Sequence, residues 1–84
     1  MIYIIDSSAW IEYFIGSDKG EVLKRLFENK ENMFMIVECC LAEIKGWCLR
    51  NNKEFDEFYP VIRANSLIIH LNEQDWIEAA DEWF

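Results

Sequence analysis

The chain has 84 residues, of which 52% are hydrophobic and 15% aromatic, with only three Gly and one Pro. This composition excludes an intrinsically disordered or collagen-like chain and predicts a single small domain, marginally stable unless it associates. The formal net charge of −8 argues against a protein that binds nucleic acid by its own charge, because such binding depends on Lys and Arg neutralising phosphates. A site in which metal ions supply the positive charge is compatible with this balance.

The three cysteines, Cys39, Cys40 and Cys48, favour a reducing compartment. Their number is odd, and Cys40 and Cys48 would lie about 12 Å apart on a helix, too far for a disulfide. No Cys/His spacing resembles a zinc site, and His70 is predicted to be a partly exposed strand residue. Because there is no basic N-terminal region and no apolar stretch near the ~20 residues of a membrane span, we expect a cytoplasmic protein that does not bind a membrane.

The apolar residues predict alternating strands and helices. Short apolar runs predict strands at 1–5, 33–37 and 67–71, the first of them buried on both faces. Helical spacing predicts helices at 8–15, 18–29, 38–50, 55–62 and 73–84. In the last helix the following residues are expected to form a buried stripe: Trp76, Ile77, Ala80 and Phe84.

Local signals predict where these helices begin and end. Gly16 is expected to end the first helix, and the segment 18–21 resembles a capping box for the second. Pro60 predicts a break or a fresh first turn, because proline in a helix interior costs about 3 kcal/mol. Asn72 is expected to cap the last helix, with Asp75 in its first turn.

Strands alternating with helices predict parallel pairing with right-handed crossovers. The expected fold is therefore α/β, with a short parallel sheet in a three-layer α/β/α arrangement. Functional residues in such sheets lie at the carboxyl ends of the strands. Asp6 lies at such an end and becomes the first candidate.

Asp6 and Glu43 are the two candidate metal ligands. Taken alone, Asp6 also fits a capping carboxylate on the next helix, and Glu43 fits a solvated acid at the margin of an apolar stripe. If the first two strands are parallel neighbours, however, both carboxylates reach the same end of the sheet. Clustered oxygen ligands are what Mg²⁺ and Mn²⁺ prefer, and a hydrated ion there could activate water.

Three segments resemble the PIN domain family, in particular the VapC-like toxins of toxin–antitoxin pairs. Residues 4–14 (IIDSSAWIEYF) closely resemble the opening of these domains, and residues 41–44 (LAEI) resemble their second motif. Residues 71–80 (LNEQDWIEAA) resemble the end of the third strand and the helix that follows. The resemblance covers the whole chain and is carried by the order and spacing of the motifs.

The resemblance implies a Mg²⁺- or Mn²⁺-dependent endoribonuclease fold that cleaves RNA. Asp6 and Glu43 match two of the metal-binding acids of the family, and Ser8 matches a hydroxyl position beside the site. The family has further aspartates after a fourth strand, and no segment of residues 1–84 resembles that region. Asp75, Asp81 and Glu82 do not replace them, because they match the preceding helix. We therefore expect a single, incomplete PIN-like domain that lacks the C-terminal strands and has weak ribonuclease activity or none.

An alternative is a non-catalytic interaction module, or a split-domain fragment that assembles with itself, with a complementary fragment or with an antitoxin. A third alternative is a chain with no function of its own. The family's strand order, 3-2-1-4-5, would make residues 2–5 the edge of a three-stranded sheet. This segment carries no Lys, Pro or charge of the kind that protects natural edges, so we expect a homo-oligomer in which two first strands pair.

Overall fold

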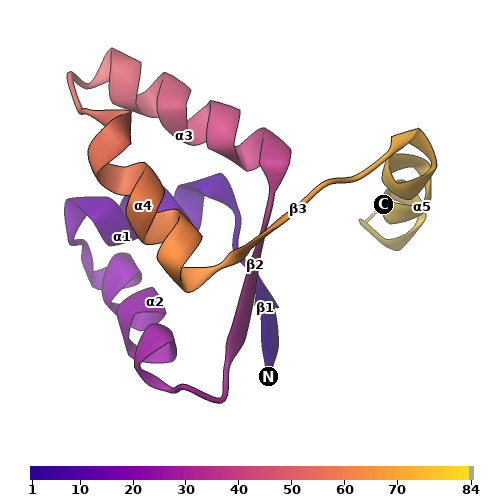
Figure 1. Ribbon diagram of the computed structural model, residues 1–84, viewed down its shortest axis with the longest axis horizontal. Helices are drawn as coiled ribbons and strands as arrows, with labels where there is room; N and C mark the ends of the chain where they lie inside the picture. Colours follow the sequence, from indigo (N-terminus) through magenta and orange to yellow (C-terminus); the bar gives the residue numbers. More distant parts are fainter. Residues whose placement is uncertain (84) are drawn as a thin grey trace.

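The computed structural model describes residues 1–83, with side chains for residues 1–78. It has an α/β fold with a three-stranded parallel sheet and five helices (Figure 1). The elements, in chain order, are β1 (Ile2–Ile4), α1 (Ser7–Ile15), α2 (Asp18–Glu28), β2 (Met33–Val37), α3 (Glu38–Arg50), α4 (Phe55–Asn65), β3 (Leu67–Ile69) and α5 (Glu73–Trp83). The predicted α/β class, the parallel pairing and the order of elements are confirmed.

The strand order is β1-β2-β3, so β2 is the central strand and β1 is an edge. Both pairs are parallel, with Ile4 opposite Met35 and Met35 opposite Leu67. Since side chains alternate across a strand, these three side chains share one face of the sheet. The expectation that β1 lies at an edge of the described sheet is confirmed.

Helices α1 to α4 form one layer over the opposite face of the sheet (Figure 1). Trp10 is fully buried in the core and lies among aromatic rings, with ring centroids 5.7 Å from Phe14 and 5.4 Å from Phe27. Aromatic residues at these separations add specific edge and face contacts to the area that they bury. The buried core consists of Ile5, Trp10, Leu23, Phe34, Ile36, Ile44, Cys48 and Ile62.

The expectation that the first strand is buried on both faces is wrong. Ile2 and Ile4 are 63% and 64% exposed, whereas Tyr3 and Ile5 face the helical layer. The reason is that α1 to α4 supply only one of the two helical layers of a three-layer arrangement. Helix α5 lies apart from that layer, beyond the end of β3 (Figure 1).

The buried stripe expected on α5 is also wrong where the structure describes it. Trp76 and Ile77 are exposed, since α5 lies beyond the sheet end and does not cover a core. The side chains of Ala80 and Phe84 lie outside the described residues. Within the described part of the chain, no helix has the length and apolarity needed to cross a membrane.

Helix ends follow the local signals with two exceptions. Gly16 ends α1 with a positive φ of 73°, and Asn72 and Asp75 cap α5 reciprocally, with N···O distances of 2.9 and 3.1 Å. Helix α2, however, is capped one residue earlier than expected, because the Ser17 hydroxyl accepts from the Gly20 N–H.

The second exception is α4, which runs through Pro60 without a break. Proline removes one helical hydrogen bond, but residues on both sides anchor this helix to the core. Phe58 stacks on Phe14 with 4.3 Å between ring centroids, and Ile62 is fully buried. Tertiary packing thus outweighs the local cost of the proline.

Candidate functional site

The carboxyl ends of the three strands meet at one end of the sheet, as expected. The Ile5 N–H donates to the carbonyl of Met35 at 2.9 Å, so pairing with β2 continues to the residue before Asp6. Helix α3 begins at Glu38, immediately after β2. The parallel pairing therefore brings Asp6 and the helix that carries Glu43 to the same end of the sheet.

Asp6 is the N-cap of α1. Its Oδ1 accepts from the backbone N–H of Ala9 at 2.8 Å, which confirms the capping interpretation. This hydrogen bond uses one carboxylate oxygen, and a carboxylate has a second oxygen that can bind a cation. Capping and metal binding by Asp6 are therefore compatible.

Ser8 lies beside Asp6 on the surface of α1. Both residues line a shallow hollow of about 290 Å³ that also includes Glu12 and Lys19. The Glu12 carboxylate is engaged by the hydroxyl of Ser17. The structure thus brings two of the three predicted site residues together, whereas Glu43 does not line this hollow.

Glu43 is exposed on α3 and lies with two thiols. Its carboxylate and the sulfur atoms of Cys39 and Cys40 are all within 4.8 Å of one another, the only such group of three possible metal ligands among the described residues. Positions i, i+1 and i+4 of a helix allow this grouping, which neither disulfide geometry nor zinc-site spacing in the sequence indicates. Thiols favour softer ions such as Zn²⁺, whereas carboxylates suit Mg²⁺ and Mn²⁺.

The Cys40 thiol lies between the start of α1 and Glu43. The pKa of this thiol is raised to about 11, first by burial and then by the nearby Cys39 and Glu43, while a hydrogen bond with the backbone of Ser7 acts in the opposite direction. The groups that act on Cys40 therefore come from both segments of the predicted site. The 6–8 segment and Glu43 flank one half-buried thiol.

A Glu38–His70 pair occupies the same end of the sheet. Val37 and Ile69, the last residues of β2 and β3, are opposite each other in the register of the sheet. Glu38 and His70 directly follow them. The Nδ1 atom of His70 lies 2.5 Å from the Glu38 carboxylate, and the histidine side chain is 74% exposed. No sequence signal indicated this pair, because its members are 32 residues apart and meet only through the register of two strands.

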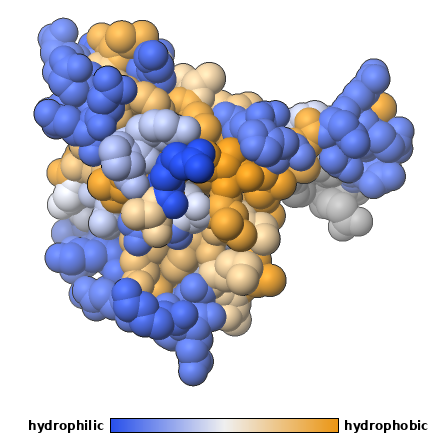
Figure 2. Space-filling view, viewed as in Figure 1, coloured by the Kyte–Doolittle hydropathy of each residue, from blue (hydrophilic) through white to orange (hydrophobic). Residues whose placement is uncertain are grey.

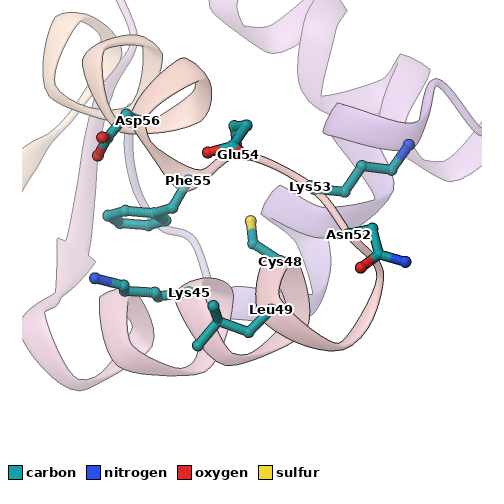
Figure 3. Close-up of a pocket in the computed structure, with 8 residues that line it drawn as sticks. All are labelled: Lys45, Cys48, Leu49, Asn52, Lys53, Glu54, Phe55 and Asp56. Atoms are coloured by element: carbon teal, nitrogen blue, oxygen red, sulfur yellow. The ribbon is translucent and has the colours of Figure 1, made fainter.

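A second hollow lies between α3 and α4 and has a volume of about 360 Å³ (Figure 3). It is lined by Lys45, Cys48, Leu49, Asn52, Lys53, Glu54, Phe55 and Asp56. Its two lysines are balanced by two acids, and the Nζ of Lys45 lies 5.9 Å from the centre of the Phe55 ring. The buried Cys48 at its floor has a raised pKa, caused first by burial and then by Glu54. This hollow holds none of the predicted site residues.

No protein-family model, no curated protein and no solved structure matches this chain. The residues at the carboxyl end of the sheet are therefore the features of this chain that indicate a function.

Proposed function

We propose that residues 1–84 form a PIN-like fold of the VapC type and carry part of a Mg²⁺- or Mn²⁺-dependent endoribonuclease site. The observation that carries the proposal is the parallel pairing of β1 and β2. It brings Asp6 and the Glu43 helix to one end of the sheet, in the order and spacing of the family motifs. The domain is expected to lie in the cytoplasm, with RNA as the substrate class.

Asp6 and Glu43 are the residues that would hold the ion, with Ser8 beside them. Both carboxylates are exposed, which suits Mg²⁺ because this ion keeps several of its waters. When bound, the cation supplies a nucleophilic water and stabilises negative charge on a phosphodiester. It also offsets the repulsion between RNA and a chain of net charge −8.

Catalysis by the isolated chain is expected to be weak or absent. Two carboxylates supply about half of the acidic ligands that the family resemblance implies. Loss of preorganised groups at a reacting phosphate costs several kcal/mol of transition-state stabilisation, and each 1.4 kcal/mol is tenfold in rate. A complementary fragment that contributes further acids would restore the site.

Isothermal titration calorimetry with Mn²⁺ and Mg²⁺ tests the metal site. Asp6→Asn keeps an oxygen for the helix cap, and Glu43→Gln keeps the side-chain shape, so both remove charge with little change in fold. Each is expected to weaken binding about tenfold or more, whereas Glu57→Gln, an exposed acid on α4, is the matched control and leaves it unchanged. Equal metal binding by all four proteins would reject the site.

RNA cleavage by the same proteins tests the activity separately. Little Mg²⁺-dependent cleavage is expected from the purified chain. Robust cleavage that disappears in both Asp6→Asn and Glu43→Gln would instead show that another acid or another chain completes the site.

A non-catalytic interaction module is the second candidate, and a specific observation favours it. The face of the sheet opposite the helical layer carries exposed hydrophobic side chains, which in soluble proteins marks an interaction surface. Such a module would bind itself, a complementary fragment or an antitoxin. Absence of both metal binding and cleavage would leave this candidate.

A further inference from the structure

One face of the sheet is apolar and is not covered by any part of the chain whose side chains the structure describes, residues 1–78. We call it the open face; it consists of Ile2, Ile4, Met33, Met35, Leu67 and Ile69, which alternate with the core residues along the three strands. Four of these side chains are between 47% and 64% exposed, and none of the six is charged. Figure 2 shows hydrophobic surface gathered beside the strands, between the helical layer and α5.

Two further surfaces adjoin the open face, and the described side chains on them have no partner element. Helix α5 carries the exposed Trp76 and Ile77 and stands away from the helical layer (Figure 1). At β1, Met1 and Ile5 direct their backbone bonds to β2, so the alternate residues Ile2 and Ile4 turn their N–H and C=O groups to the free edge.

The chain exposes more surface than a compact monomer of its mass, and the excess is close to the area that a stable interface buries on one partner. The accessible surface is 6180 Å², about 900 Å² more than the ~5,300 Å² expected for a compact monomer of 10.1 kDa. A standard protein–protein interface buries ≈ 800 Å² on each partner. The Cα radius of gyration, 13.4 Å, likewise exceeds the ~12 Å of a compact 84-residue domain.

We propose that the open face and α5 form an isologous interface with a second copy of this chain. The chain has a net charge of −8, which would favour a basic partner, but the open face carries no charge that could select one. A second copy of the chain presents the same apolar face and therefore fits. A two-fold axis lets the same patch serve on both sides, with the sheets facing each other about 10 Å apart. This proposal does not rest on the metal site.

The open face, rather than the edge of β1, is the main contact. Antiparallel pairing of two β1 strands would exchange bonds between Ile2 of one copy and Ile4 of the other. That arrangement continues the sheet and leaves the open faces of both copies uncovered on the same side. Face packing removes more exposed hydrophobic surface than edge pairing does. It is therefore favoured, because burial of apolar area is the dominant favourable term in association.

Sedimentation equilibrium over a range of protein concentrations tests the interface. Leu67→Glu places a charge on the open face at the edge away from β1, and it is expected to weaken dimerisation at least about tenfold. Leu49→Glu is the matched control, because Leu49 is 72% exposed at the far end of α3 and should leave the dimer unchanged. Circular dichroism checks that both variants fold.

Three further measurements separate the remaining outcomes. Ile4→Pro removes a backbone N–H donor at the edge of β1 without breaking a bond to β2, and its association is expected to be unchanged. If a folded Ile4→Pro variant lost the dimer while Leu67→Glu kept it, the edge of β1 and not the open face would be the contact. Added salt should strengthen the dimer by screening the like charges of the two copies. A monomer at every concentration, with a radius of gyration in X-ray scattering near 12 Å, would show that α5 folds back on its own sheet and would overturn the proposal.

Discussion

Replacing Asp6 by Ala removes the side-chain acceptor at the N-terminus of α1 and tests whether this residue supports the fold as well as a metal site. The substitution eliminates the 2.8 Å hydrogen bond that the Ala9 N–H donates to the Asp6 carboxylate. Loss of an N-cap costs about 1 kcal/mol, within a range of about 0.5–2 kcal/mol. For an 84-residue domain the unfolding entropy is about 0.18 kcal/mol/K, so Asp6→Ala should lower Tm by about 6 °C.

Asp6→Asn separates the hydrogen bond from the charge. The amide oxygen can still accept from Ala9, so this variant loses only the interaction of the carboxylate with the helix dipole, about 0.3–1 kcal/mol. Thermal unfolding followed by circular dichroism, at one protein concentration and without metal, should therefore rank wild type above Asp6→Asn and Asp6→Ala lowest. An unchanged Tm for Asp6→Ala would contradict a stabilising role of the cap.

Metal addition extends the same experiment to function. A ligand that binds only the folded state stabilises it by RT ln(1 + [L]/Kd). Mn²⁺ should therefore raise the Tm of the wild type more than that of Asp6→Asn, because the variant lacks a ligand charge. Equal shifts in both proteins would place the bound ion elsewhere.

The remaining predictions concern two glycines, Trp10 and the thiol of Cys40. Gly20→Ala should lower the free energy of unfolding in urea by about 1–3 kcal/mol, because the new Cβ would lie 2.2 Å from a carbonyl oxygen of α1. Gly46→Ala should raise the same free energy by up to ~1 kcal/mol, since its Cβ would meet only the end of a flexible arginine side chain. Trp10→Ala should cost about 3–5 kcal/mol in the same assay, and a smaller loss for Trp10→Phe is expected because the buried indole N–H has no partner. Between pH 9.0 and about 11 the folded chain keeps the Cys40 proton that the unfolded chain releases, so stability should fall with rising pH over this range, and Cys40→Ala should reduce the slope in urea titrations at stepped pH.

Local signals in the sequence determined the elements and several of their ends. Apolar periodicity placed three strands and five helices in the correct order, because the spacing of apolar side chains follows the helical or extended repeat of the local backbone. Gly16 and Asn72 predicted helix boundaries for the same reason, since a cap acts within one turn. The capping role of Asp6 and the parallel pairing that brings it near the Glu43 helix also followed from the chain alone.

Features that depend on distant residues were decided only by the tertiary structure. The Glu38–His70 pair requires the register of β2 against β3, and the run of α4 through Pro60 requires anchoring by rings of α1. The apolar run of β1 indicated burial on both faces, yet Ile2 and Ile4 are exposed because no helix covers that side of the sheet among the described residues. Apolar residues in a strand favour burial by their chemistry. Which of them are actually buried depends on the elements that pack against each face of the sheet.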